Sequence, residues 1–291
     1  MPKLIAEFCQ NHNGDFELLK KMIGAAAESG ATHGKMQTIF ADTVTYRPQF
    51  EDGLVQNGIV KSIKRPYRDE YDRLKGLEIS YAETEKFIKI CKENSLIPMT
   101  TCFTRHHVNQ LEELGFKSIK VASYDCASFP LIRDLSNKFD EIVVSTGATF
   151  DDEVEYAAKI LNGRNFSMLH CVTLYPTQMK DMHMERMKWL RTLAPSVGYS
   201  DHSLVSTTGI IASKSALALG ADIIERHFTL LPEGETRDGP VSINKEQLQE
   251  LSTFSKLSNN EQLLKMDVDH PGWRTVIGKK NRVLTDEELL N

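Results

Sequence analysis

Residues 222–229 read DIIERHFT, a short run in which aliphatic and aromatic residues flank three consecutive ionisable groups, Glu225, Arg226 and His227. The β-branched and aromatic content predicts a β-strand. Burying unpaired ionisable groups in a strand is costly. We therefore expect these side chains to lie where they have partners or a chemical task.

Seven similar runs precede this one, at residues 4–10, 33–40, 97–103, 118–124, 141–147, 166–172 and 196–202. Amphipathic stretches such as VEYAAKILNG and KEQLQELSTFSKL follow them, with apolar residues three and four apart. Eight strand–helix units predict an α/β protein: a (β/α)8 TIM barrel as a single domain over residues 1–265, then a C-terminal tail, 266–291. A doubly wound sheet more usually has about five or six strands and a glycine-rich first turn, whereas Gly14 stands alone.

Composition and charge argue against a nucleic-acid-binding, membrane-spanning or secreted protein. The chain has 291 residues, 41% of them hydrophobic and 26% charged, and a net charge of -5, which gives no electrostatic reason to expect nucleic acid or an anionic membrane as a partner. No apolar run approaches the roughly 18 residues of a membrane span, and the N-terminus lacks a secretory pattern. We expect a cytoplasmic protein. Its five scattered cysteines predict neither disulfides nor a structural zinc site.

One long segment interrupts the strand–helix repeat. Residues 40–78 exceed the usual length of a connection, and such loops are commonly lids or binding loops. Within it, the charged run at 61–73 reads as the solvated face of a loop.

Polar residues mark the ends of the predicted strands, where the loops of a barrel converge and its chemistry collects. Lys35 and Lys120 stand in otherwise apolar or small-residue strands, and Ser123, Ser145 and Ser200 lie at or near strand ends. Each lysine can pair with a buried carboxylate. Together with hydroxyl donors, two lysines also suit a phosphate or carboxylate ligand.

His202 and His227 lie near the ends of neighbouring predicted strands, each preceded by an acidic residue in DH and ERH. Two imidazoles with a carboxylate and waters suit a divalent ion such as Mn²⁺ or Mg²⁺, although a lone histidine is more often a hydrogen-bonded core residue. Glu7 ends the strand LIAEF, so it is a candidate general acid or base. The alternative for Glu7 is a salt bridge to Lys35.

At these positions the chain resembles the sialic acid (N-acetylneuraminate) synthase family. The resemblance runs over nearly the whole chain, in order, through AEFCQNHNGD, KMQT, TTCF, KVASYDCASFPLI, VVSTGA, LHCVTLYPT, GYSDHS, ERHFT and RDGPVSI. Members condense phosphoenolpyruvate with an N-acyl-mannosamine-type sugar to form a nine-carbon 2-keto-3-deoxy acid and phosphate. The barrel is also what this resemblance implies.

The resemblance implies roles for particular residues. Glu7 matches the residue that moves a proton at the enolpyruvyl carbon, and His202 and His227 match the metal ligands, with Glu225 in support. His227 thereby counts among the catalytic residues. Phosphoenolpyruvate-binding positions fall on Lys35, Lys120, Ser123, Ser145, Thr173 and Ser200. Sugar-binding positions fall on Gln37, Asp125, Tyr175 and Asp238. A homodimer is also implied.

Several departures bear on the substrate. Cys9 stands where the family has glycine, Gln10 where it has an apolar residue, and Thr173 where it has asparagine. The C-terminal antifreeze-like domain, whose arginine a partner subunit inserts over the sugar's acyl group, has no counterpart in this sequence. We expect Arg47, Arg65 or Arg68 of the long segment, or Arg237, to supply that cation, or the sugar to lack an acyl group.

Two other functions fit the residues. One is a related phosphoenolpyruvate-dependent synthase that uses a different aldose and makes a seven- or eight-carbon acid. The other is a catalytically silent protein that binds sugar phosphates. The proton-transfer candidate Glu7 and the two histidines argue against the silent protein.

Overall fold

The computed structural model describes residues 1–290, which form the predicted (β/α)8 barrel. Eight parallel strands close in the order β1-β10-β9-β8-β7-β6-β5-β2. Their bounds are β1 Lys3–Cys9, β2 His33–Thr38, β5 Ile97–Cys102, β6 Ser118–Val121, β7 Glu141–Ser145, β8 Phe166–His170, β9 Ser196–Asp201 and β10 Ile223–His227. Each predicted strand coincides with one of these, so the fold prediction is confirmed.

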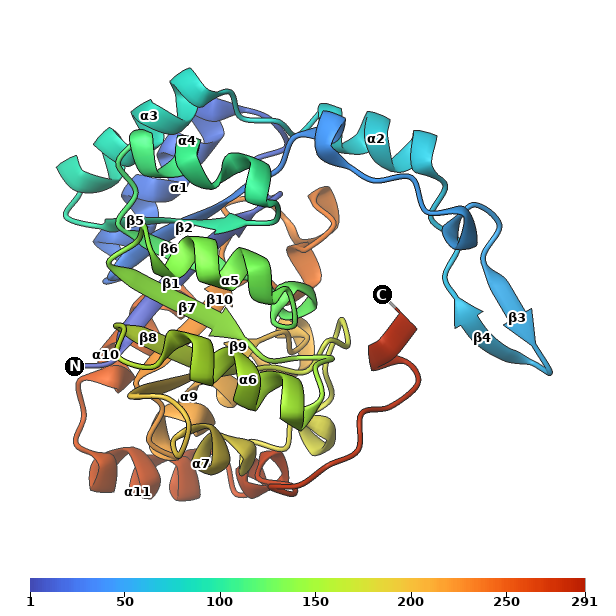
Figure 1. Ribbon diagram of the computed structural model, residues 1–291. Coiled ribbons are helices and arrows are strands. Elements are labelled where there is room, and N and C mark those ends of the chain that lie inside the picture. The colour runs from blue at the N-terminus through green and yellow to red at the C-terminus, as the bar shows by residue number, and fades with distance from the viewer. Residues whose placement is uncertain (291) are drawn as a thin grey trace.

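Helices cover the outside of the barrel (Figure 1). Their bounds are α1 Phe16–Glu28, α3 Tyr81–Glu93, α4 Val108–Glu113, α5 Phe129–Ser136, α6 Asp151–Leu161, α7 Arg186–Leu190, α8 Val205–Thr208, α9 Ile211–Ala218, α10 Lys245–Ser255 and α11 Asn259–Asp269. In α1, the Asp15 side chain accepts hydrogen bonds from the first turn, and Leu19, Met22, Ile23 and Ala26 form the buried stripe. The helices therefore pack their apolar stripes onto the strands.

The barrel interior holds a separate apolar cluster. Ile5, Met99, Val143, Leu169 and Ile223 come from five strands and contact one another inside the barrel, apart from the larger core between strands and helices. We call these five residues the apolar plug. Side chains two positions apart in a strand share a face, so Glu7 and Glu225 lie above Ile5 and Ile223 on the same interior face.

Residues 40–78 form an arm that projects from the barrel (Figure 1). The arm contains the antiparallel hairpin of β3 Leu54–Gln56 and β4 Ile59–Ser62, followed by α2 Tyr67–Lys75. The interpretation of residues 61–73 as a loop face was therefore wrong for residues 61–62, which end β4, and for residues 67–73, which belong to α2. The missed signals are Pro66 at the N-cap, acidic residues in the first turn of α2 and basic residues in its last turn.

The C-terminal segment returns to the barrel. The predicted end of the barrel, residue 265, falls inside α11, and Trp273 and Val276 belong to the outer core. The chain then passes between the barrel and the arm, in red in Figure 1. Glu288 is buried there and forms two hydrogen bonds of 2.6 Å with Arg282. Within residues 1–290, no helix is both long and apolar enough to cross a membrane.

Candidate active site

A charged layer lies directly above the apolar plug, toward the carboxyl ends of the strands. We call it the mouth layer, and its buried members are Glu7, Lys35, Lys120, Ser145, Ser200 and Glu225. Lys35 forms an ion pair with Glu7. Glu225 lies between the two lysines, 3.5 Å from Lys35 Nζ and 3.4 Å from Lys120 Nζ. Six strands thus converge on one small polar network.

Hydroxyl groups complete the mouth layer. Lys120 Nζ donates to Ser145 Oγ at 2.7 Å, and Ser200 Oγ donates to Glu225 at 2.8 Å. The sequence left two roles open for Lys35, a pair with a buried carboxylate or the binding of an anion. The ion pair with Glu7 shows that the first is present. The second role stays open, because two ammonium groups and two hydroxyls converge on one place. An anionic ligand bound there would replace the carboxylates as their partner.

Burial and charge act in opposite directions in this layer. Burial lowers the pKa of Lys35 to about 8; Glu225 opposes this shift and Lys120 adds to it. Burial also disfavours the charged form of Glu225, but Lys120 and Lys35 outweigh that effect and hold its pKa below the usual range. The layer thus keeps a carboxylate ionised between two cations.

His202 and His227 lie side by side at the rim of this layer, with ring centroids 5.4 Å apart. The Tyr175 hydroxyl lies 2.9 Å from His202 Nε2. Burial lowers the pKa of His202 to about 3, with a further contribution from His227, and burial also lowers the pKa of His227. Both shifts favour the neutral form of the imidazole, the form that binds metals.

The buried His202 Nδ1 has no hydrogen-bond partner among residues 1–290. An unsatisfied buried nitrogen beside a second imidazole and a carboxylate fits a divalent cation.

Arg226 lies on the opposite face of β10 from Glu225 and His227. Its guanidinium pairs with Asp201 at 2.5 Å and donates to the Ser203 carbonyl at 3.0 Å, and Arg226 and Asp201 are both buried. The charges of the ERH triplet therefore divide between the barrel interior and a buried ion pair behind the strand, which is the arrangement that the alternation of a strand predicts.

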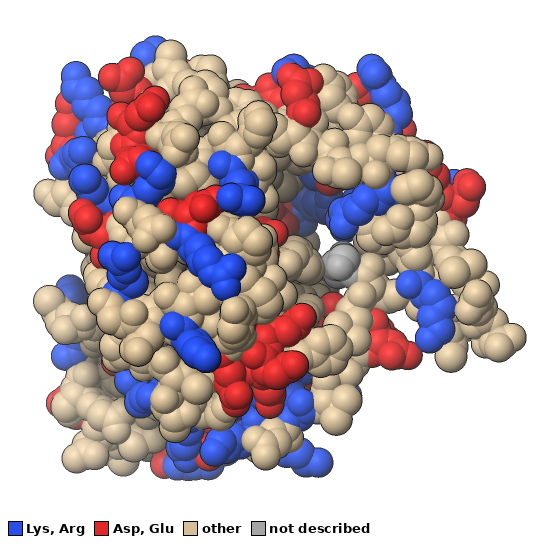
Figure 2. Space-filling model, in the orientation of Figure 1, with Lys and Arg blue, Asp and Glu red and all other residues tan. Residues whose placement is uncertain are grey.

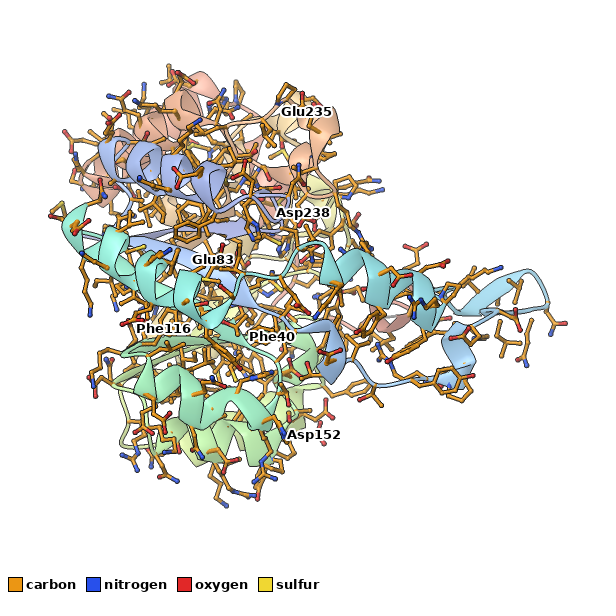
Figure 3. All side chains as sticks on the ribbon, turned by 90° about the horizontal axis from the view of Figure 1, so that it is seen from above. Phe40, Glu83, Phe116, Asp152, Glu235 and Asp238 are labelled. Atoms are coloured by element: carbon orange, nitrogen blue, oxygen red, sulfur yellow. The ribbon has the colours of Figure 1, made fainter. Side chains whose placement is uncertain are left out.

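Cys9 and Asp238 add a contact that sequence reasoning missed. Cys9 Sγ donates to Asp238 Oδ2 at 2.8 Å, and ligand atoms of Cys9, Asp238 and His227 all lie within 4.8 Å of one another. Burial and then Asp238 raise the pKa of Cys9 well above its ordinary value. Figure 3 shows Asp238 at the end of the barrel from which the arm projects. Because 229 positions separate Cys9 from Asp238, no local motif links them.

All the predicted site residues line one cavity of about 1170 Å³. They are Glu7, Lys35, Gln37, Lys120, Ser123, Asp125, Ser145, Thr173, Tyr175, Ser200, His202, Glu225, His227 and Asp238. Thr173 and Ser123 contact residues outside this set. Thr173 donates to the Glu288 carbonyl at 3.3 Å, and Ser123 Oγ lies 3.0 Å from Cys171 Sγ. Burial raises the pKa of Asp125 to about 6.

Arginines form the outer wall of the same cavity. Arg47, Arg65 and Arg237 line it, and so does Arg73 of α2, which forms two hydrogen bonds with Glu70. Arg68 does not line it and pairs with Asp72 at 2.9 Å on the exposed side of α2. Figure 2 shows Lys and Arg side chains in the hollow between barrel and arm. The basic residues expected of the arm and of Arg237 therefore reach the cavity, except Arg68.

Comparison with known proteins identifies relatives of this chain. The chain is 32% identical over 264 residues to an N,N'-diacetyllegionaminic acid synthase of Campylobacter jejuni, covering 86% of this chain and 74% of that protein. It is 30% identical over 255 residues to an N-acetylneuraminate-9-phosphate synthase of Drosophila melanogaster, covering 86% and 66%.

A solved structure has the same fold. The N-acetylneuraminic acid synthetase of Leptospira borgpetersenii, determined with citrate, superposes with a TM-score of 0.74 at 24% identity over 93% of each chain. Residues 22–266 match the model of the NeuB family. On the family match and the identity to its relatives, this chain belongs to the NeuB family.

Proposed function

We propose that the protein is an enzyme that condenses phosphoenolpyruvate with an N-acyl-mannosamine-type sugar, producing a nine-carbon 2-keto-3-deoxy acid and phosphate. The observation that carries the proposal is the mouth layer. Lys35 and Lys120 lie on either side of Glu225 at the floor of a cavity of about 1170 Å³, with Ser145 and Ser200 as hydroxyl donors. Such preorganised donors suit a small ligand with a carboxylate and a phosphate.

The reaction forms one carbon–carbon bond and breaks one carbon–oxygen bond. The enol carbon of phosphoenolpyruvate attacks the aldehyde carbon of the open-chain sugar, and the aldehyde oxygen gains a proton. Water then adds at carbon two, and the bond between that carbon and the phosphate oxygen breaks, releasing phosphate. We assign to Lys35 and Lys120 the binding of the two anionic groups. To Glu7 we assign the proton transfer at the enolpyruvyl group, in which its carboxylate takes the proton that water loses on adding at carbon two; its burial beside Lys35 supports this role.

His202 and His227 would hold a divalent cation, for which Mn²⁺ and Mg²⁺ are the first candidates, with Glu225 in support. When bound, such an ion supplies a Lewis acid that polarises a carbonyl oxygen. The lowered pKa of both rings, which favours their neutral form, and the unpartnered His202 Nδ1 within residues 1–290 support this assignment.

The outer part of the cavity would bind the sugar through Gln37, Asp125, Tyr175 and Asp238. The two relatives named above are synthases of different acids, and one of them is named for a phosphorylated product. Arg47, Arg65 and Arg237 therefore become the candidates for contacting an acyl or anionic substituent of the sugar, since guanidinium groups bind carbonyl oxygens and phosphates well.

We extend the proposal to a homodimer. The hairpin of the arm exposes Leu54, Val55, Ile59 and Val60, and association with a second copy would cover these apolar side chains. Sedimentation equilibrium of the parent and of a Val55→Glu variant tests this extension: a monomeric parent contradicts it.

The decisive experiment measures phosphate release from phosphoenolpyruvate with a panel of mannosamine-type sugars, with and without a chelator, and determines the product mass. We expect phosphate release that depends on both sugar and metal, with a nine-carbon product. A seven- or eight-carbon product would assign a different aldose, and no consumption of phosphoenolpyruvate with any sugar would favour a silent binding protein.

A further inference from the structure

Three different kinds of metal ligand meet at the rim of the mouth layer. The Cys9 thiol, a ring nitrogen of His227 and the Asp238 carboxylate lie within 4.8 Å of one another. Ligand atoms bound to one zinc ion at about 2.0–2.3 Å lie within roughly 4.6 Å of each other. The three groups are therefore separated by nearly the distances that a single ion requires.

The backbone directs Cys9 into this position. The pairing of β1 with β2 changes register between Glu7 and Cys9, and an irregularity of this kind turns the following side chain. Cys9 has φ of 44°, in the left-handed region that glycine adopts most easily. Its amide donates to Glu7 Oε1 at 2.6 Å, which holds the turn in place. A side chain at a position suited to glycine indicates that the thiol has a role here.

A second observation points to a ligand at the same place. His202, whose ring lies 5.4 Å from that of His227, keeps a buried Nδ1 without a hydrogen-bond partner in the described part of the chain. Buried polar atoms in native proteins rarely lack partners unless an ion or water supplies one. The neighbourhood thus contains an unpartnered ring nitrogen next to the three clustered ligand groups.

We propose that Cys9 is a metal ligand in this chain: its thiolate, with His227 and Asp238, forms a cation site that prefers Zn²⁺ or Co²⁺ to Mg²⁺. The inference rests on the proposed function for the role of the ion: it keeps His227 as a ligand, adds Cys9 and Asp238, and replaces Mn²⁺ and Mg²⁺ by softer ions as the preferred occupants. Thiolate is a soft ligand that selects such ions, whereas carboxylate and water ligands suit Mg²⁺ and Mn²⁺. When the ion binds, the Sγ–H bond breaks and the proton passes to solvent.

The alternative is a purely positioning role, in which the Cys9 thiol donates to Asp238 and orients that carboxylate toward the sugar. The two roles differ in sulfur chemistry. A serine hydroxyl can make the same hydrogen bond to a carboxylate, but it is a poor substitute for a thiolate as a ligand of Zn²⁺ or Co²⁺.

The test uses the full chain stripped with a chelator and titrated with Co²⁺, read by its near-ultraviolet sulfur-to-cobalt charge-transfer band. Competition with a chromophoric chelator gives Zn²⁺ affinity, and electron paramagnetic resonance gives Mn²⁺ affinity. The variants are Cys9→Ser and Cys9→Gly, and glycine suits the positive φ. Cys171→Ser is the matched control, because Cys171 is a second buried thiol in the same cavity.

We expect one Co²⁺ per chain and a charge-transfer band that both Cys9 variants lose and Cys171→Ser keeps. Zn²⁺ affinity should fall about 100-fold in the Cys9 variants, while Mn²⁺ affinity changes less than about threefold. A parent without the band, or a band that survives in folded Cys9→Gly, overturns the proposal. A failure of the proposed function is distinct, since it would leave the band intact while phosphoenolpyruvate is not consumed.

Discussion

The apolar plug and the mouth layer occupy neighbouring levels of the same barrel interior and have opposite chemistry. The plug consists of Ile5, Met99, Val143, Leu169 and Ile223, while Glu7, Lys35, Lys120 and Glu225 carry the charge one level above. Apolar burial stabilises a barrel directly. Buried ion pairs often contribute no more than apolar residues of the same size would. The difference indicates that one level maintains the fold and the other is retained for its chemistry.

The largest expected effect is on stability, and it follows from removing the Glu225 carboxylate that Lys35 and Lys120 share. Glu225→Gln should lower the free energy of unfolding by about 3–5 kcal/mol, because Lys35 and Lys120 lose the carboxylate between them. Denaturant titration measures this loss. Added phosphoenolpyruvate should stabilise the variant more than the parent, since the ligand supplies negative charge. A loss of unfolding free energy below about 1 kcal/mol in the variant would show that the two lysines do not depend on Glu225.

A truncation in the plug should separate stability from activity. Leu169→Ala removes buried atoms from the interior cluster and should cost about 2–4 kcal/mol of unfolding free energy. At a temperature well below the unfolding midpoint, kcat/KM should stay within about twofold of the parent, because Leu169 lies outside the cavity lining. A folded variant with a tenfold lower kcat/KM would contradict the division between the two levels.

A charged cluster elsewhere in the barrel should act on stability alone. Glu141, at the start of β7, accepts from Ser118 at 2.6 Å and pairs with Lys3 and, at 3.6 Å, with His33. Burial opposes its ionisation, but His33, Lys3 and Ser118 outweigh that effect and lower the pKa of Glu141 to about 2. Its stabilisation is therefore complete above about pH 4.3 and is lost as the pH falls toward 2.

Comparison with Glu141→Gln makes this measurable. Between about pH 5 and pH 2, the parent should lose about 1–3 kcal/mol more unfolding free energy than the variant does. Parallel losses in both proteins would show that Glu141 is not a source of the pH dependence.

The smallest effect concerns the arginines at the rim of the cavity. Arg237→Ala should raise the KM for the sugar about tenfold, equivalent to about 1.4 kcal/mol, and leave the KM for phosphoenolpyruvate nearly unchanged. Arg68→Ala is the matched control, because Arg68 pairs with Asp72 away from the cavity. If the two variants behave alike, the sugar does not depend on this cation.

Local pattern was enough to predict the barrel. Most strands, such as Glu141–Ser145, are compact runs of buried residues, and several of them carry a predicted site residue at or near the carboxyl end, so strand position and inward direction follow from composition and alternation. The arm was harder, because α2 has only Leu74 buried and its charged sequence resembles a loop. Helices held by few buried side chains leave a weak periodic signal.

Contacts within the site were predictable only where both partners end strands. Lys35 and Glu7 pair across neighbouring strands, so their contact was foreseen as an alternative. The contacts of Cys9 with Asp238 and of Thr173 with Glu288 join a strand or strand-end loop to distant connecting segments. Such contacts depend on how loops fold over the mouth, for which a single chain carries no periodic pattern.

The five cysteines are placed so that they can report two separate opening motions. All are buried, and burial raises the pKa of Cys102 and Cys126 to about 12, so alkylating reagents should react only when the surrounding structure opens. Cys9 and Cys171 face the cavity, whereas Cys91, Cys102 and Cys126 do not line it. Time-resolved alkylation read by mass spectrometry would therefore give two separate rates in the unmodified protein. The rate at Cys9 and Cys171 measures access to the cavity, and the rate at the other three cysteines measures opening of the protein around them.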